Sequence, residues 1–436
     1  MRVLCTGDLH IGRRPTRLPH GVDVRDHTCA RLWENVVAYA VDQQVDVLAL
    51  SGDVVDRANR YFEALDPLKR GLERLAEAGI VTVAVSGNHD FDVLPQLERV
   101  LARDSFRLIG RGGQWQRETV TSRAGELLHV DGWSFPSEHW PEDPLLSYPR
   151  VARDDIPVLG LLHGDLDVTG SRYAPVRLAD LRICPVDVWL LGHVHAPARH
   201  EIAHGATVLY PGSPQAMDPG EPGLHGVWML DIVSGAPPVL RQIPLATVRY
   251  ETLMIDVTGA SDGDLLRTAV VNELGAAVAR IGDVSGPLRH LVLRLRLTGR
   301  TALHGRAAAE LEEMIRDYTR TEGDATAYVE RVVDATRPEY DLLEIAKGTD
   351  APGALARLLI EISSEGATSH ALLHGARNVA AHVRGSRAYR GLPVSPEARQ
   401  SAGDVPSGVD DDTALRQLLA AQANTLLDTL LMQKHV

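Results

Sequence analysis

Short apolar runs of strand length recur through the first half of this sequence, and segments with helical spacing separate them. Residues 45–50, 80–85 and 158–162 are such runs, rich in Val, Leu and Ile, and they are too short to span a membrane. Strands that alternate with helices form layered α/β domains. The pattern therefore predicts an α/β fold from residue 1 to about 240.

Other elements of this region follow from the same periodicities. A helix that begins near Asp26 or Thr28 would place Leu32 and Val36 on one face, because they are four residues apart. A second helix is expected over residues 61–78. Further strands are expected at residues 3–6, 188–191, 207–210 and 226–231.

A change of pattern marks the expected end of the first domain, at the Pro-rich stretch 237–244. A smaller α+β domain is predicted over residues 245–345, because strand-like alternation at 253–257 and 290–297 accompanies helical spacing. The helices expected in this domain cover residues 265–280 and 307–319.

The C-terminal part of the chain is predicted to be helical. Helices are expected within residues 350–384, and residues 385–412 are rich in Gly, Pro, Ser and Asp, as mobile linkers are. Residues 413–436 form an expected amphipathic helix, whose leucine stripe either docks a partner or packs back on its own domain. The stripe comprises Leu415, Leu418, Leu419, Gln422, Leu426, Leu430 and Leu431.

The formal net charge of −13 bears on the class of substrate. A protein that held DNA by itself would usually carry a basic face. The charge does not exclude DNA, because acidic side chains can lie in a metal site and a partner can supply a basic groove.

The sequence also bears on location. No apolar segment is long enough to span a membrane, and the chain enters its first strand directly after Met1-Arg2, without an export signal. A cytoplasmic protein is therefore expected. Cys5, Cys29 and Cys184 have no CxxC spacing, which argues against a disulfide framework or a zinc ribbon.

Five short polar motifs each follow a predicted strand. They are Asp8-Leu9-His10, Gly52-Asp53-Val54-Val55-Asp56-Arg57, Gly87-Asn88-His89-Asp90, His163-Gly164 and Gly192-His193-Val194-His195. Each motif alone occurs by chance in many proteins, but five in this order at strand ends are not a coincidence. The carboxyl ends of strands are where open α/β sheets bind ligands.

The residue types suit a pair of divalent cations. Such cations take oxygen and imidazole ligands, and one carboxylate commonly bridges both. We assign Asp53 as the bridge. The first metal then takes Asp8, His10, Asp53 and His195, and the second takes Asp53, Asn88, His163 and His193. A water activated by both metals would be the nucleophile, so no serine or cysteine is needed.

His89 is the expected catalytic side chain. Beside Asn88 it would face the scissile phosphate and stabilise the transition state or protonate the leaving oxygen. Asp90 would orient it. Asp56 is expected to hold a ligand histidine and Arg57 to contact phosphate, although a helix-start or surface ion-pair role is equally open for both.

Several basic residues lie in loops after the first two ligand strands, where they could contact a DNA backbone or simply be solvated. These are Arg13, Arg14, Arg17 and Arg60. His200, His204 and His225 follow the motifs and could line the site, but isolated histidines of this kind are usually polar surface.

These motifs resemble those of the calcineurin-like metallophosphoesterase superfamily, over residues 1 to about 235. Within it the chain is most similar to SbcD-type DNA repair exonucleases, bacterial relatives of the meiotic recombination nuclease that include a YhaO-like group. The features that favour this branch are Asp8-Leu9-His10-Ile11-Gly12 and Tyr210-Pro211-Gly212-Ser213-Pro214-Gln215, the latter followed by Glu221 and the strand at 226–231.

The resemblance implies a layered β-sandwich core flanked by helices, followed by an α+β capping domain that contacts DNA. It implies manganese-dependent exonuclease and endonuclease activity with two Mn²⁺ ions. It also implies DNA, an SMC-like ATPase subunit of the SbcC type and a second copy of the chain as partners.

Two alternatives stay open. A phosphodiesterase or phosphatase of the same superfamily could act on nucleotides or other small phosphoesters, although the long segment after the core is then unneeded. A non-catalytic scaffold subunit would gain nothing from a full ligand set and His89.

Overall fold

The computed structural model describes most of the 436-residue chain. The described residues are 1–58, 64–100, 106–149, 154–201, 206–233, 235–282, 286–363, 367–385 and 412–434. The chain divides into two compact units whose extents differ from those of the predicted domains. Unit 1 comprises Met1–Ile255, Thr268–Leu297 and Ala308–Val333, and unit 2 comprises Asp256–Arg267, Thr298–Ala307 and Asp334–Val436.

Among the described residues, two six-stranded sheets form the core of unit 1. The first has the order β12 (Val239–Pro244), β11 (Gly226–Asp231), β1 (Arg2–Thr6), β2 (Val47–Ser51), β3 (Val81–Val85) and β4 (Phe106–Leu108). The second has the order β5 (Gln116–Thr121), β6 (Leu127–Trp133), β7 (Val158–His163), β8 (Val188–Gly192), β10 (Thr207–Tyr210) and β9 (Ala198–Glu201). Strands β1 to β4 run parallel, and so do β6, β7, β8 and β10. The layered α/β prediction is confirmed.

The continuous apolar runs have a simple cause, which β2 shows. Its residues Val47 and Ala49 pack in a cluster with Leu159, Leu161 and Leu190 of the second sheet. Leu48 and Leu50 point the other way, into the cluster formed with the helices. Because both faces of the strand are buried, no alternating polar residue interrupts the run.

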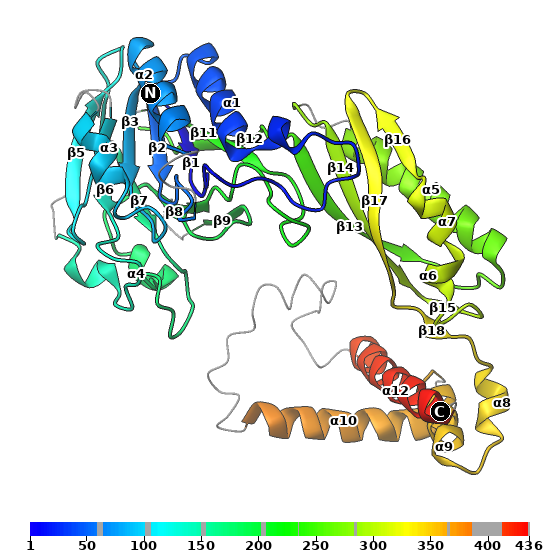
Figure 1. Ribbon diagram of the computed structural model, residues 1–436. Helices are drawn as coiled ribbons and strands as arrows, with labels where there is room; N and C mark the ends of the chain where they lie inside the picture. The colour runs from blue at the N-terminus through cyan, green and yellow to red at the C-terminus, as the bar shows by residue number, and fades with distance from the viewer. Residues whose placement is uncertain are drawn as a thin grey trace. The chain divides into compact units, whose positions relative to one another are not determined.

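Two helices cover the outer face of the first sheet and lie side by side in Figure 1. Helix α1 (Cys29–Asp42) begins after Thr28, whose hydroxyl accepts a hydrogen bond from the Arg31 N–H at 3.3 Å. Helix α2 (Leu65–Glu77) buries Leu68, Leu72 and Leu75. The first three residues of the predicted helix 61–78 lie outside the described residues.

Several elements of the core were not predicted. They are β4, β5, β6, β9 and β12, with the short helices η1 (Val24–His27), α3 (Leu94–Val100), η2 (Pro144–Ser147) and α4 (Leu178–Leu181). Strand β5 reads Gln-Arg-Glu-Thr-Val-Thr and lies at a sheet edge, so its exposed side chains are polar. Strand β12 occupies the Pro-rich stretch taken as a boundary, and it is also an edge strand, the position in a sheet that tolerates Pro.

A four-stranded sheet follows the core. Its order is β13 (Val248–Asp256), β14 (His290–Thr298), β17 (Ala325–Asp334) and β16 (Thr319–Glu322). Helix α5 (Gly263–Gly282) lies along one face of this sheet in Figure 1. The single helix predicted over 307–319 is wrong: two short helices, α6 (Ala307–Glu310) and α7 (Glu312–Arg316), meet at Leu311, whose side chain is buried.

The C-terminal segment is helical as predicted. It contains α8 (Leu342–Ala346), α9 (Ala351–Ser363), α10 (Ala367–Gly385) and α12 (Asp412–Lys434). Nearly all of the predicted linker 385–412 lies outside the described residues. Two residues, Arg300 and Arg337, begin the short strands β15 (Arg300–Thr301) and β18 (Arg337–Pro338), and both contact Asp428 of α12. Within the part of the chain described, no helix combines the length and apolar character that crossing a membrane requires.

The packing of α1 against α2 predicts how a substitution at Gly71 changes the stability of the protein. A Cβ at this position would overlap the indole of Trp33, whose Nε1 donates to the Pro67 carbonyl at 3.0 Å. We expect Gly71→Ala to lower the free energy of unfolding by about 1–2 kcal/mol, because overpacking and loss of that hydrogen bond outweigh the gain in helix propensity. Urea unfolding followed by tryptophan fluorescence measures it.

The matched control is Glu73→Ala on the exposed face of the same helix, which should change stability by less than about 0.5 kcal/mol. An unchanged or higher unfolding midpoint for Gly71→Ala would contradict the packing described.

Candidate metal centre

All seven predicted metal ligands gather at the carboxyl ends of strands from both sheets. Asp8 follows β1, Asp53 follows β2 and Asn88 follows β3 in the first sheet. His163 is the last residue of β7, and His193 follows β8 in the second. The layered fold therefore brings together motifs that lie far apart in the sequence.

A first group consists of Asp8, His10 and His195, whose ligand atoms lie within 4.8 Å of one another. The Nε2 atoms of His10 and His195 are 3.1 Å apart. The Asp8 carboxylate also accepts hydrogen bonds from the His193 N–H, at 3.0 and 3.1 Å, so it ties the loop after β8 to the loop after β1.

A second group consists of Asp53, His163 and His193, again within 4.8 Å. His163 Nε2 lies 3.1 Å from the side-chain oxygen of Asn88 and 3.4 Å from Asp53 Oδ2. The same Oδ2 atom is 3.8 Å from His10 Nε2 in the first group. Asp53 thus lies between the two groups, where a bridging carboxylate must lie.

The protonation of His163 shows that these donors fit a cation. Its Nδ1 is 3.0 Å from the Ser51 carbonyl, which can only accept, so Nδ1 carries the hydrogen. In the neutral ring, the form that binds a metal, Nε2 is unprotonated and faces the Asn88 oxygen, another acceptor. Two acceptors face each other favourably when a cation lies between them, and carboxylate, imidazole and amide oxygen are suitable ligands for divalent metals.

The electrostatics agree with this conclusion. Burial lowers the pKa of His163, but Asp53 and Asp8 outweigh it and raise that pKa to about 9. Burial raises the pKa of Asp53, but His163, His10 and His89 outweigh it and hold that pKa far below its ordinary value. A cavity that attracts a proton this strongly also attracts a metal cation.

The ligand loops have unusual backbone conformations. Asp8, His10, Asp53 and His193 have φ values of 50°, 44°, 49° and 95°, in the left-handed region that non-glycine residues rarely adopt. The glycines of the motifs let these loops approach each other. A Cβ at Gly87 would overlap the Asp53 carboxylate, and one at Gly192 would overlap the Ser51 carbonyl.

His89 lies at the edge of this centre and is about one-third exposed. Its Nε2 is 4.0 Å from Asp53 Oδ2, and its Nδ1 is 3.6 Å from Asp56 Oδ1. The same Asp56 oxygen is 3.4 Å from His10 Nδ1. Burial lowers the pKa of His89, but Asp56, the largest contributor, and Asp53 raise it by more. The net upward shift favours the imidazolium form. Asp56 therefore contacts both a ligand histidine and the predicted catalytic histidine.

Asp90 does not contact the side chain of His89, which it was expected to orient. Its buried carboxylate accepts hydrogen bonds from backbone N–H groups, those of Gly87 at 2.8 Å, Val54 at 2.7 Å and Val55 at 3.3 Å. In the turn after β3, the Asp90 side chain points back under the ligand loops instead of toward His89. It joins the loop of Asn88 to the loop of Asp53, and Asp56 takes the place beside His89.

The other predicted residues are more dispersed. Arg13 Nε is 4.0 Å from Asp56 Oδ1, so this arginine borders the centre, whereas Arg14 and Arg17 are exposed. Arg57 is paired with Glu138. His225 is buried and its Nδ1 lies 2.6 Å from the Ser213 carbonyl. His200 lies in the edge strand β9, and Arg60 and His204 lie outside the described residues.

Two acidic residues near the ligands were not predicted as part of the site. Asp165 Oδ1 is 3.6 Å from His193 Nε2, and Glu221 Oε1 is 2.6 Å from His195 Nδ1. Glu221 lies 26 residues after His195, and no spacing rule links them. Asp165 follows the His163-Gly164 motif directly, which was the available signal.

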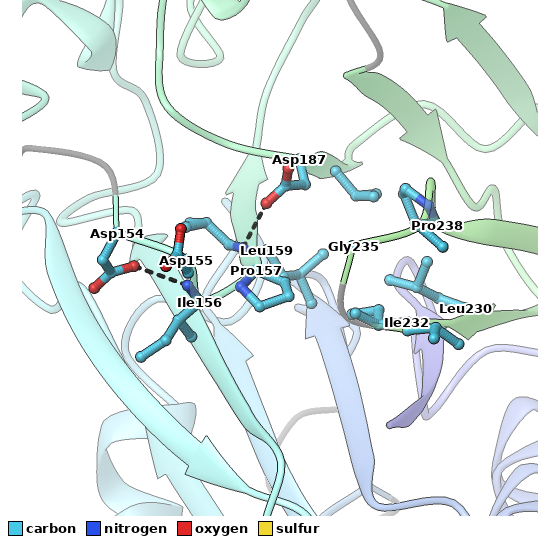
Figure 2. A pocket seen from close by; sticks show the side chains of 14 residues that line it. Asp154, Asp155, Ile156, Pro157, Leu159, Asp187, Leu230, Ile232, Gly235 and Pro238 are labelled. Atoms are coloured by element: carbon cyan, nitrogen blue, oxygen red, sulfur yellow. Dashed lines mark hydrogen bonds between the residues drawn. The ribbon is translucent and has the colours of Figure 1, made fainter.

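A pocket of about 540 Å³ lies at the amino ends of β7 and β8, away from the metal ligands at their carboxyl ends (Figure 2). Two of its aspartates are engaged with backbone: Asp154 accepts from the Ile156 N–H at 3.1 Å, and Asp187 accepts from the Val158 N–H at 2.8 Å. Both carboxylates hold the start of β7, which is a structural role.

The sequence matches two known protein families. Residues 1–197 match the family described as calcineurin-like phosphoesterase. The chain contains a calcineurin-like phosphoesterase domain. Residues 250–337 also match the middle domain of metallophosphoesterase YhaO, a region that overlaps the predicted capping domain.

Curated relatives of the chain are distant. The uncharacterized metallophosphoesterase YhaO of Bacillus subtilis is 27% identical over 260 residues, which cover 55% of this chain and 58% of that protein. The DNA double-strand break repair protein Mre11 of Methanopyrus kandleri is 26% identical over 234 residues, covering 50% of this chain and 49% of that one. The chain thus spans about half the length of the curated relatives it matches.

Among solved structures, a dimetal phosphatase from Danio rerio is 14% identical and covers 56% of this chain and 98% of that chain, with a TM-score of 0.37.

The hydrogen bonds of Asp90 predict the effect of Asp90→Asn. An amide has one acceptor oxygen, so a buried backbone N–H would face an NH₂ group. We expect the metal-free protein to lose about 1–3 kcal/mol of unfolding free energy, because a buried donor is left unsatisfied. Chemical denaturation in the presence of a chelator measures this loss. Unchanged stability with normal metal binding but slower catalysis would instead restore the predicted role beside His89.

Proposed function

We propose that this phosphoesterase is a metal-dependent DNA nuclease that hydrolyses phosphodiester bonds with two divalent ions. The observation that carries the proposal is the pair of candidate ligand groups that meet at Asp53, with the one-third exposed ring of His89 beside them. When bound, two such ions activate a water and neutralise the charge that develops on the phosphate.

The residues of the chain supply the rest of the chemistry. Asp8, His10, Asp53, Asn88, His163, His193 and His195 hold the ions. His89, whose pKa the neighbouring Asp56 raises, stabilises negative charge on the phosphate or protonates the leaving oxygen. Arg13, at the border of the centre, is the described arginine best placed to contact the nucleic-acid backbone.

Two findings favour DNA over a small phosphoester. Relatives at 26% and 27% identity are named DNA double-strand break repair proteins. The segment at 250–337 matches the middle domain of metallophosphoesterase YhaO, and a small-substrate hydrolase has little need of such a segment. We propose Mn²⁺ as the metal, because carboxylate, imidazole and amide ligands together suit it.

We further propose an SMC-like ATPase of the SbcC type as partner and a homodimer as the assembly. Helix α12 is the candidate docking element, but its leucines divide into two sets. Leu415 is buried, and Leu431 packs against the apolar cluster that contains Leu359 of α9. Leu418 and Leu426 are exposed. The predicted stripe therefore packs in part on its own unit, and we propose its exposed leucines as the contacts for a partner helix.

The decisive prediction concerns His89. We expect the purified chain to degrade end-labelled linear DNA with Mn²⁺, and His89→Ala to lower the rate about 10²- to 10⁴-fold while both ions still bind, since the loss is one of acid–base catalysis. The matched control is His200→Ala in β9, which should cleave DNA at the wild-type rate. Gel assays of cleavage, with calorimetric titration of Mn²⁺, make the measurement.

A small phosphodiester such as bis-p-nitrophenyl phosphate separates the alternatives. Hydrolysis of this ester with DNA left intact would make the chain a small-substrate phosphodiesterase. Mn²⁺ binding without hydrolysis of either compound would favour the scaffold.

A further inference from the structure

Glu221 lies in the loop between β10 and β11 and contacts a metal-ligand histidine. Its Oε1 is 2.6 Å from Nδ1 of His195. A carboxylate can only accept, so His195 Nδ1 carries the hydrogen and Nε2 keeps its lone pair. That Nε2 is the atom that faces His10 Nε2 at 3.1 Å, in the first ligand group.

The carboxylate of Glu221 is itself fixed. Its second oxygen accepts from the Met217 N–H at 2.8 Å and from the Ser213 hydroxyl at 3.3 Å. The Ser213 N–H donates to the carbonyl of His195 at 2.9 Å, so the loop holds both the backbone and the ring of the histidine. The Glu221 side chain is only 16% exposed, which keeps water from replacing these contacts.

The loop is anchored at two further points. The carbonyl of Met217 accepts from both the backbone N–H and the hydroxyl of Thr16, at 2.8 and 3.2 Å. The Gln215 amide donates to the Val248 carbonyl at 2.8 Å, and its oxygen accepts from the Thr247 N–H at 2.9 Å. The loop that carries Glu221 is therefore hydrogen-bonded both to the segment before α1 and to the segment around the start of β13.

We infer that Glu221 is a positioning residue of the metal centre: it fixes the tautomer and orientation of His195 so that Nε2 points toward Asp8 and His10. This inference rests on the metal centre of the proposed function. This role explains a motif that the sequence analysis used only as a family feature. The motif is Tyr210-Pro211-Gly212-Ser213-Pro214-Gln215 with the Glu221 that follows it. Carboxylate partners of ligand histidines generally act in this way.

The test compares Glu221→Ala and Glu221→Gln with the wild-type chain by calorimetric titration of Mn²⁺ into metal-free protein. We expect one of the two sites to weaken about 10- to 100-fold in Glu221→Ala. Glu221→Gln keeps an acceptor oxygen at the same reach and should weaken that site less. The matched control is Asp218→Asn, an exposed residue of the same loop whose carboxylate accepts from the Gly220 N–H at 2.6 Å. This variant should bind both ions normally.

A second measurement reads the tautomer directly. In the metal-free protein, at a pH where the ring is neutral, ¹⁵N NMR should show the hydrogen of His195 on Nδ1 in the wild type and a shift toward Nε2 in Glu221→Ala. Wild-type affinity at both sites in Glu221→Ala, or an Nε2–H tautomer in the wild type, would overturn the inference. Because neither readout uses DNA, failure of the inference is distinguishable from failure of the nuclease proposal.

Discussion

The carboxylate of Asp53 joins the two sheets chemically. One oxygen accepts from the His89 N–H at 2.8 Å and so holds the loop after β3. The other lies near His163 of the second sheet and His10 of the first. Burying such a carboxylate is costly unless positive charge and hydrogen-bond donors surround it. His10, His89 and His163, from three different motifs, supply those compensations, so their loops are mutually dependent rather than merely adjacent.

Much of this arrangement could be predicted, for physical reasons that particular residues make plain. Leu48 and Leu50 point to one layer and Val47 and Ala49 to another, so β2 had to read as a continuous apolar run. Polar motifs after such strands had to meet at one end of the sheets. Edge strands such as β5 were missed because solvent, not a core, determines their composition.

Side-chain direction within a turn was harder to predict. Sequence proximity suggested that Asp90 touches His89, but the turn sends Asp90 to the backbone of Gly87 and Val54 and leaves Asp56 beside His89. The contact of Glu221 with His195 depends on how a long loop returns to the site. The buried Asp428 was also missed: it lies within the leucine pattern of α12, yet Arg300 Nη1 at 2.8 Å and Arg337 Nη1 at 3.2 Å fix how that helix faces its unit.

The left-handed backbone at Asp8, His10, Asp53 and His193 has a consequence for how such a sequence can evolve. Each of these conformations costs about 1–3 kcal/mol in a residue with a side chain, and glycine would relieve most of it. Substitutions that would make the fold more robust therefore coincide with those that would remove a ligand. Under the proposed function, selection for stability alone would drive the chain toward an inert relative with the same architecture, and the four strained side chains would record selection for chemistry.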